Sequence, residues 1–337
     1  MCLNYNENNF LKRVTFLFVI LITFINPSYG FQIKEKDNLN LYNMVVAQDG
    51  TGDFTTIQDA IYAAKSFPYE RVVINVKNGV YNEKVHVYSW NTNVSLIGES
   101  KEGTIITFDD YFKKIGLGRN STFHTSTLLV EGDDFIAKNI TVKNMAGPVG
   151  QAIALSVNAN RCYFENCAFI GNQDTVYTAG EGFKQYFKNC YIEGTTDFIF
   201  GEATILFEGC EIYNKSNSYI TAASTPKSQA YGYVFKNCNL TADSNVTEVY
   251  LGRPWRFYAK TVFINCKMGK HIKPEGWHNW KKPEAETLSF YAEYNCSGEG
   301  YQPERRVSWS HQLKKSQAKK YTKENILKST TTWYRNL

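Results

Sequence analysis

The chain has 337 residues, a formal net charge of +5 and 20% charged residues. This length allows one large domain or two ordinary ones. Its 23 tyrosines and 22 phenylalanines, interrupted by only eight prolines, favour strands and turns over helices. A basic protein attracts polyanions, but the sequence lacks the interleaved basic and aromatic motif of a nucleic-acid-binding module, so nucleic acid is not an expected partner.

The N-terminus has the pattern of a secretory signal peptide. Lys12 and Arg13 precede an apolar run from Val14 to Ile25, and turn-forming or small residues follow as far as Gly30. Twelve residues are too few for a membrane span, which needs about 20, and an uncleaved anchor is the alternative. We predict a signal peptide over residues 1–30, removal of which lowers the net charge from +5 to +4. The mature protein should then be secreted, to a periplasm or outside the cell, with no attachment to a membrane.

The cysteines and histidines do not suggest a metal site. Cys2 leaves with the signal peptide, and an odd number of cysteines remains, so full pairing is excluded. There is no C-x-x-C pair and no H-x-x-x-H pair, so we expect neither zinc nor another cofactor. The remaining cysteines are Cys162, Cys167, Cys190, Cys210, Cys238, Cys266 and Cys296.

An internal repeat organises the chain. The motif Phe-x-Asn-Cys, or Phe-x-Gly-Cys, occurs five times, and its cysteines are 23, 20, 28 and 28 residues apart. Weaker copies extend the repeated region to roughly residues 90–300. Each unit contains short β-rich segments separated by polar turns and shows no helical period, which favours a parallel β-solenoid. A leucine-rich repeat is excluded because its signature is missing.

The repeat also predicts how the coils pack. We expect the Phe and the Cys of each unit to lie on one strand, point inward and stack on the same residues of the next coil. A disulfide between Cys167 and Cys190 is an alternative state of two of these thiols. Thr55 or Thr56 should cap a helix that carries Ile57, Ala60, Ile61 and Ala64 on one face and closes the end of the solenoid. The segment from Ser310 to Lys328 should pack on the coils as a helix or tail.

The same spacing brings two carboxylates together. Asp174 and Asp197 each lie seven residues after a repeated cysteine, and Tyr177 and Phe200 each lie ten after it. Because adjacent strands are about 4.8 Å apart, the two carboxylates should face each other across one rung. Two carboxylates so close cannot both ionise easily, so one should be an acid and the other a nucleophile or base. A surface ladder of aspartates in two turns is the alternative interpretation.

Neighbouring residues favour catalysis. Gln173 precedes Asp174, and Gln151 follows a glycine-rich turn. Amide donors of this kind can hold a developing oxyanion. Arg253 and Trp255 lie in the segment Leu-Gly-Arg-Pro-Trp, and an arginine can keep one aspartate charged.

These segments together resemble the pectin methylesterases. The stretches that carry the resemblance are Gly150 to Leu155, Gly171 to Tyr177, Asp197 to Gly201 and Leu251 to Trp255, within a similarity from about Val45 to Leu327. The resemblance implies a right-handed parallel β-helix, single-stranded and all-β, with a linker over residues 31–41, a catalytic domain over 42–328 and a C-terminal tail over 329–337. It implies a carboxylic ester hydrolase that acts on methylated pectin as a monomer, without a cofactor or metal.

The resemblance also assigns roles to individual residues. Asp197 would be the nucleophile that forms an aspartyl acyl-enzyme, Asp174 the general acid and then base, and Arg253 the partner that keeps Asp197 ionised. Gln151 and Gln173 would form the oxyanion hole. The residues expected to contact the sugar are Trp255, Tyr177, Phe200, Tyr250 and Thr122, while Phe198 should face the core because it alternates with Phe200.

Rival functions lack their signatures. A polygalacturonase-like hydrolase would carry Asn-Thr-Asp and Gly-His-Gly motifs, which are absent, and a pectate lyase would need an acidic calcium cluster. A serine esterase would need a G-x-S-x-G elbow, also absent. A non-catalytic carbohydrate-binding solenoid is the alternative from outside the enzymes, and the intact Asp174, Asp197 and Arg253 disfavour it.

Overall fold

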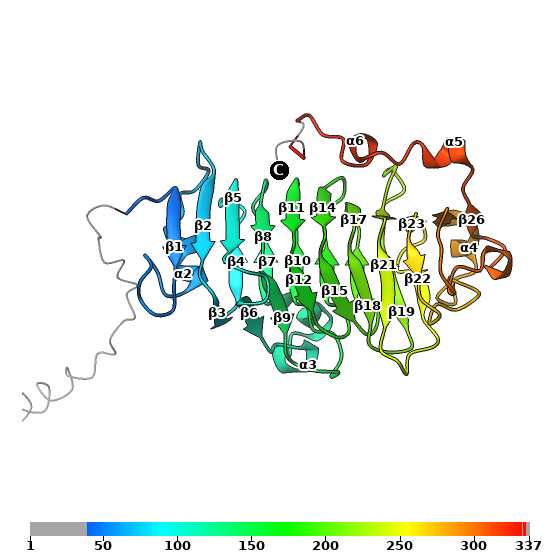
Figure 1. Ribbon diagram of the computed structural model, residues 1–337, viewed down its shortest axis with the longest axis horizontal. Helices are drawn as coiled ribbons and strands as arrows, with labels where there is room; N and C mark the ends of the chain where they lie inside the picture. Colours follow the sequence, from blue (N-terminus) through cyan, green and yellow to red (C-terminus); the bar gives the residue numbers. More distant parts are fainter. Residues whose placement is uncertain (1–38, 332, 335–337) are drawn as a thin grey trace, which may run out of the picture. The chain divides into compact units, whose positions relative to one another are not determined.

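The computed structural model describes residues 39–331, 333 and 334. The predicted signal peptide and most of the predicted linker lie outside the described residues. Figure 1 shows the strands lying side by side in successive coils. No helix within the described ranges is both long and apolar enough to cross a membrane.

Three parallel sheets make up the structure. Sheet A contains β1 (Asn43–Val46), β2 (Val72–Val76), β5 (Val94–Gly98), β8 (Ile136–Lys138), β11 (Cys162–Glu165), β14 (Lys184–Lys188), β17 (Thr204–Glu208), β20 (Tyr233–Lys236), β23 (Lys260–Ile264), β25 (Phe290–Tyr294) and β26 (His311–Gln312). Sheet B contains β3 (Gly79–Asn82), β6 (Thr104–Phe108), β9 (Thr141–Asn144), β12 (Ala168–Ile170), β15 (Tyr191–Gly194), β18 (Glu211–Asn214), β21 (Asn239–Ala242) and β24 (Lys267–Met268). Sheet C contains β4 (Val85–Val87), β7 (Leu128–Val130), β10 (Leu155–Val157), β13 (Val176–Thr178), β16 (Ile199–Gly201), β19 (Tyr219–Ala223) and β22 (Tyr250–Pro254).

Helices are short and lie outside the sheets. They are α2 (Ile57–Ala63), η1 (Gly118–His124), η2 (Pro303–Arg305), α3 (Phe112–Ile115), α4 (Glu284–Leu288), α5 (Lys315–Ala318) and α6 (Lys323–Ile326), of which η1 and η2 are 3₁₀-helices. The predicted parallel β-helix is therefore confirmed, because the chain passes from sheet A to B to C and returns to A one coil further on.

The repeated phenylalanine forms a stack through the interior. Phe164 and Phe187 pair in register on β11 and β14, with ring centroids 4.5 Å apart. Phe207, Phe235 and Phe263 continue the stack, and all five rings are fully buried. Apolar surface removed from water in this way stabilises the fold by about 25 cal/mol per Å².

The Phe and the Cys do not share one strand, which corrects the sequence-based expectation. Phe164 lies on β11 of sheet A, whereas Cys167 lies directly before β12 of sheet B. Between them Asn166 adopts a left-handed φ of 51°, and the corresponding asparagines of the other units have φ between 49° and 55°. Asn tolerates this conformation better than most residues, and the resulting corner lets residues three apart both point inward.

The repeated cysteines form a second ladder, and all seven described thiols are free and buried. The structure therefore does not contain the disulfide considered between Cys167 and Cys190. Instead the Cys190 thiol donates to the carbonyl oxygen of Phe164 one coil earlier, at 3.5 Å. Cys210 repeats this contact with Phe187, and the later cysteines continue it. The Phe-x-Asn-Cys motif thus supplies a ring, a corner and a thiol that link each coil to the previous one.

The helix that closes the N-terminal end of the coils and the C-terminal segment that packs on them are both present as expected. Thr56 caps α2 through its hydroxyl, and Ile57, Ala60 and Ile61 are buried in the main core. The C-terminal segment runs back across the outer face of sheet A, where Ile326 and Leu327 pack against strand side chains (Figure 1).

The corner asparagines provide a test of the fold. Asn166 donates from its side-chain amide to Asn139 at 2.8 Å as well as turning the chain. We expect Asn166→Ala to lower the free energy of unfolding by about 1–2 kcal/mol, because alanine is strained at this φ. Urea denaturation followed by circular dichroism measures it. Asn166→Gly, which tolerates the same φ, should lose less, and an equal loss would contradict this explanation.

Candidate active site

The two predicted carboxylates stand next to each other on the outer face of sheet C. Asp174 lies two residues before the start of β13, and Asp197 lies two residues before the start of β16. Tyr177 and Phe200 pair in register on those strands. Both aspartates adopt left-handed φ, 65° and 49°, which turns each chain into its strand. The predicted stacking of the acids is therefore confirmed, with adjacent strands about 4.8 Å apart.

Arg253 holds one of the two acids. Its Nε donates to Oδ1 of Asp197 at 2.9 Å, and its Nη2 donates to Oδ2 at 2.6 Å. Such a fork binds both carboxylate oxygens and fixes their plane. The guanidinium itself is sandwiched between the rings of Tyr219 and Trp280, 3.9 and 3.7 Å from their centroids. Asp197 is thus oriented by an arginine that cannot easily move.

The two acids have different electrostatic environments. Burial and the negative charge of Asp197 raise the pKa of Asp174 well above its usual value, against the weaker opposing effect of Arg253. Burial also raises the pKa of Asp197, but hydrogen bonds and charge from Arg253 work against that shift. Within the described chain the Asp174 side chain has no hydrogen-bonding partner. The arrangement favours a protonated Asp174 beside an ionised Asp197.

The two glutamines also come from adjacent coils. Gln151 and Gln173 form an isolated parallel bridge, and the Ala152 amide donates to the carbonyl oxygen of Gln173 at 3.1 Å. Both side chains line the same hollow as the two acids. Two amide donors therefore face the space above the carboxylates, where an oxyanion could be held.

The hollow has a volume of about 310 Å³. Of the residues predicted from the sequence, those that line it are Thr122, Gln151, Gln173, Asp174, Asp197, Phe200, Arg253 and Trp255. Tyr177 lies beside it, with its ring 4.8 Å from that of Phe200. Phe198 is fully buried in the core, as predicted.

Tyr250 is the predicted sugar contact that the structure places apart from the hollow. Its ring stacks on Tyr219 with centroids 5.3 Å apart, and Tyr219 in turn lies against Arg253. Tyr250 therefore supports the ring that supports the arginine.

Four lining residues were not predicted: Arg119, Phe123, Ala222 and Trp280. Ala222 pairs in register with Phe200 and could have been found by extending the repeat one coil further. The others lie in η1 or in a loop between the repeated strands, so their spacing follows no repeat. Trp280 reaches the site from a loop in which it has a φ of 55°.

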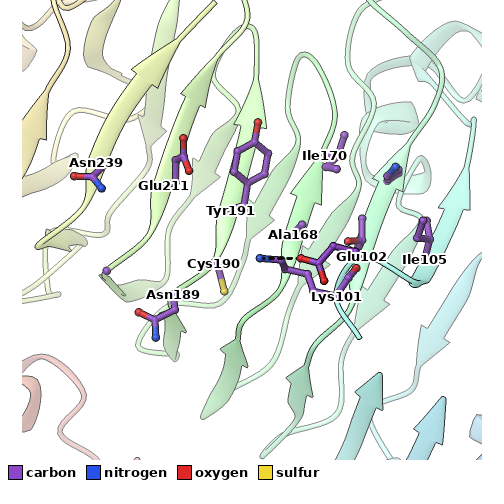
Figure 2. Close-up of a pocket in the computed structure, with 13 residues that line it drawn as sticks. Lys101, Glu102, Ile105, Ala168, Ile170, Asn189, Cys190, Tyr191, Glu211 and Asn239 are labelled. Carbon is purple, nitrogen blue, oxygen red and sulfur yellow. Dashed lines mark hydrogen bonds and ion pairs between the residues drawn. The ribbon is translucent and has the colours of Figure 1, made fainter. Parts of the chain in front are cut away.

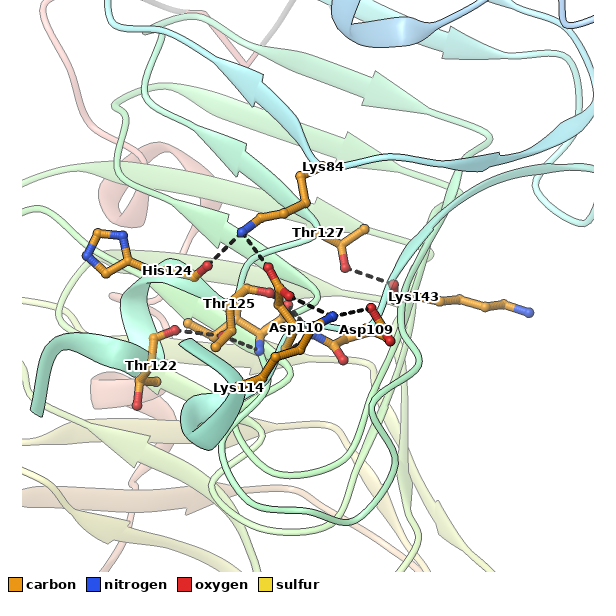
Figure 3. Close-up of polar contacts among 11 residues, drawn as sticks. Lys84, Asp109, Asp110, Lys114, Thr122, His124, Thr125, Thr127 and Lys143 are labelled. Atoms are coloured by element: carbon orange, nitrogen blue, oxygen red, sulfur yellow. Dashed lines mark hydrogen bonds and ion pairs between the residues drawn. The ribbon is translucent and has the colours of Figure 1, made fainter. Parts of the chain in front are cut away.

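A network of polar contacts holds the segment that carries Thr122 and Phe123 (Figure 3). Lys84 donates to Asp110 at 2.8 Å and to the His124 carbonyl oxygen at 2.7 Å. The Thr125 hydroxyl donates to the Thr122 carbonyl oxygen at 2.7 Å and accepts from the Ile153 amide. This wall of the hollow is thus tied to the segment between Gln151 and β10.

A larger hollow, about 540 Å³, lies on sheet B and contains none of the predicted residues (Figure 2). Lys101 and Glu102 at its edge form an ion pair at 3.6 Å, and Tyr191 donates to Glu193. The described residues contain no cluster of three His, Cys, Asp or Glu side chains that could hold a metal ion.

Comparison with known proteins agrees with this geometry. The family model described as Pectinesterase matches residues 43–330. Pectinesterase 31 of Arabidopsis thaliana is 41% identical over 281 residues, which cover 81% of this chain and 88% of that protein.

Solved structures are similar as well. The pectin methylesterase from carrot superposes with a TM-score of 0.79 at 32% identity, covering 84% of this chain and 92% of that chain. A pectin methylesterase in complex with hexasaccharide VII superposes with a TM-score of 0.74 at 29% identity, covering 87% and 99%. The chain therefore belongs to the pectinesterase family, a family of carboxylic ester hydrolases.

Proposed function

We propose that this pectinesterase hydrolyses the C6 methyl esters of polygalacturonate to pectate and methanol, with Asp197 as nucleophile and Asp174 as general acid and base. The observation that carries the proposal is the forked contact of Arg253 with Asp197, beside a second buried carboxyl that has no such partner. We also propose that the protein is secreted, as its N-terminal sequence suggests, and that it acts as a monomer on methylated pectin.

The first step forms an acyl-enzyme. An oxygen of Asp197 attacks the ester carbonyl carbon, and the amides of Gln151 and Gln173 stabilise the negative charge that develops on the carbonyl oxygen. When the tetrahedral intermediate collapses, the bond to the methoxy oxygen breaks. Asp174 transfers its proton to that oxygen, and methanol leaves.

The second step regenerates the enzyme. Asp174, now ionised, takes a proton from a water molecule, whose oxygen attacks the acyl carbon. The bond to Asp197 breaks, the galacturonate carboxyl is released, and Asp174 is again protonated. The raised pKa of Asp174 suits both roles, because the group must be protonated in the first step and ionised in the second.

Aromatic side chains would hold the sugar over these groups. Phe200, Tyr177 and Trp255 pack in one apolar cluster with Ile153 and Ala222. Their rings present apolar faces to the pyranose, while Thr122 supplies a hydroxyl at the wall of the hollow. We propose Tyr250 as an indirect contributor through Tyr219 and Arg253 rather than as a direct sugar contact.

Removal of the nucleophile tests the central role. We expect Asp197→Ala to lower kcat/KM for methanol release from methylated pectin by about a thousandfold or more, because the other carboxyl of the hollow, Asp174, is protonated and serves as the acid. A methanol assay measures the loss. Glu304→Ala, which removes an exposed carboxylate on η2, is the control and should keep wild-type activity. Wild-type methanol release by Asp197→Ala would refute the assignment.

Arg253 should control the protonation of the nucleophile. Without the guanidinium, the pKa of Asp197 should rise, so the acidic fall in kcat/KM of Arg253→Ala should move to higher pH. Arg253→Lys keeps the charge but not the fork and should lie between wild type and Arg253→Ala. A pH–rate profile of each variant measures the shift. If Arg253→Ala instead loses the β-sheet circular dichroism spectrum, the residue is structural.

The raised pKa of Asp174 also predicts a stability effect. The folded state binds this proton more tightly than the unfolded state, so the contribution to stability is present at low pH and is lost as pH rises above the unfolded value. Asp174→Asn should therefore be more stable than wild type at neutral pH and should lose this advantage near pH 3. Urea denaturation across that pH range measures the difference.

Asp110 provides a control of opposite sign. Burial by itself would raise the pKa of Asp110, but hydrogen bonds and charge from Lys84 and Lys114 lower this pKa below its usual value. Asp110→Asn should be less stable than wild type at neutral pH, and the difference should shrink as pH falls. Parallel behaviour of the two variants would contradict the proposed environments.

A further inference from the structure

The outward side chains of sheet C form one continuous row across the sheet. Each strand contributes one outward residue, which pairs in register with the outward residues of the two neighbouring strands. The row crosses β13 and β16, the strands that follow Asp174 and Asp197. Its members, in spatial order, are Arg253, Ala222, Phe200, Tyr177, Ser156, Leu129 and His86. The row begins at the arginine that holds the nucleophile and ends at β4, near the N-terminal end of the described coils (Figure 1).

Aromatic rings follow this row from the catalytic hollow. The ring centroids of Trp255 and Phe200 are 5.8 Å apart, and those of Phe200 and Tyr177 are 4.8 Å apart. Phe123, from η1, lies 5.0 Å from Tyr177 and is 38% exposed. Each of these rings therefore contacts the next, and the last one forms a ridge at the edge of the catalytic hollow.

A second hollow lies beyond the ridge. It has a volume of about 180 Å³, and Phe123 lines it as well as the catalytic hollow. Leu129 and His86, the last two members of the row, form its floor with Lys84 and His124 at its edge. The two hollows are thus neighbours that share one aromatic wall.

Three stacked rings begin at the second hollow with His86 and continue beyond it with Tyr88 and Trp90. We call these three residues the distal platform. The His86 and Tyr88 centroids are 3.9 Å apart, and the Tyr88 and Trp90 rings are parallel, 4.7 Å apart with an angle of 2°. Glu131 contacts Nε2 of His86 at 2.7 Å, which fixes the imidazole. Trp90 is 44% exposed although it is a large apolar side chain. A fixed, exposed aromatic surface of this kind is a feature that marks binding sites.

We propose that the distal platform binds a remote part of the same galacturonan chain that occupies the catalytic hollow. This inference rests on the proposed function, since it extends the substrate of that site along the row. From β16 to β4 there are four strand spacings, or about 19 Å. A trisaccharide in the catalytic hollow is too short to reach the distal platform, whereas a decasaccharide is long enough.

The contact should depend on stacking more than on charge. The only ammonium group at the second hollow's edge, Lys84, is already bound to Asp110 and to the His124 carbonyl oxygen. Flat rings instead offer apolar faces to the C–H groups of a pyranose. The gain in affinity from the distal platform should therefore change little with salt, unlike a contact made by free charges.

The test compares two ligand lengths. Trigalacturonate and decagalacturonate, both without methyl esters, are titrated into the full-length mature protein by calorimetry, so that catalysis is not required. Wild type should bind the longer ligand more tightly, and Trp90→Ala should reduce that ratio of dissociation constants about fivefold or more, the effect expected for a well-packed aromatic contact. Trp90→Phe should restore part of the ratio.

Tyr69→Ala is the matched control, because Tyr69 is a fully exposed aromatic residue near the same end of the chain but is not part of the distal platform. It should behave as wild type at both lengths. If Trp90→Ala leaves the ratio unchanged, or weakens both ligands equally, the inference is overturned. It is also overturned if sedimentation shows that Trp90→Ala abolishes a self-association of the wild-type protein, since the distal platform would then be a contact between copies.

The outcomes separate this inference from the proposed function. If wild-type protein releases no methanol from methylated pectin, the proposed reaction fails, while the dependence of binding on length still tests the distal platform. If methanol is released and the length ratio is insensitive to Trp90, the reaction stands and the distal platform fails.

Discussion

The register between successive coils is the constraint on which the rest of the structure depends. Each coil repeats a ring, a left-handed corner and a thiol, and each of these contacts its equivalent or the backbone one coil earlier. Because the strands pair without slippage, residues at equal distances from the repeated cysteine lie about 4.8 Å apart on neighbouring rungs. Asp174 and Asp197 meet for this reason, although 23 positions separate them in the sequence. The same register carries the row of outward side chains from Arg253 to His86.

Stacking two carboxylates in a partly buried site is unfavourable unless their protonation differs. Arg253 supplies the difference, because of the two described acids it forms hydrogen bonds with Asp197 and not with Asp174. The guanidinium is itself held between two aromatic rings. A buried charge left without its partner typically costs several kcal/mol, which explains why the arginine is so closely confined. Asp174, which lacks such a partner in the described chain, takes the opposite state and keeps its proton. In the proposed mechanism, these two environments make one of two identical side chains the nucleophile and the other the acid.

Much of the architecture and the centre of the site could be predicted from the sequence because both follow the repeat. The solenoid, the stacked acids and the inward Phe198 all depend on fixed offsets, which the cysteine spacing makes visible. Trp280 and Phe123 could not be predicted, since they enter the site from a loop and from η1, which have no counterpart in the other coils. The assignment of the Phe and the Cys to one strand was wrong because the intervening Asn takes a left-handed φ. The alternation of side chains between two faces holds only within a continuous strand, and this φ ends the strand. The Cys167–Cys190 disulfide was not found, since each thiol donates to a carbonyl oxygen one coil earlier.

The most direct test is a titration of the two carboxyl groups themselves. Carbon-13 NMR of protein labelled at the aspartate side-chain carboxyls follows both groups with pH, and single Asp→Asn substitutions assign them. The pair should titrate in two steps, with the higher apparent pKa lost in Asp174→Asn and lowered in Asp197→Asn, which removes the neighbouring negative charge. Two independent titrations near the ordinary aspartate pKa, each unaffected by the other substitution, would contradict the account.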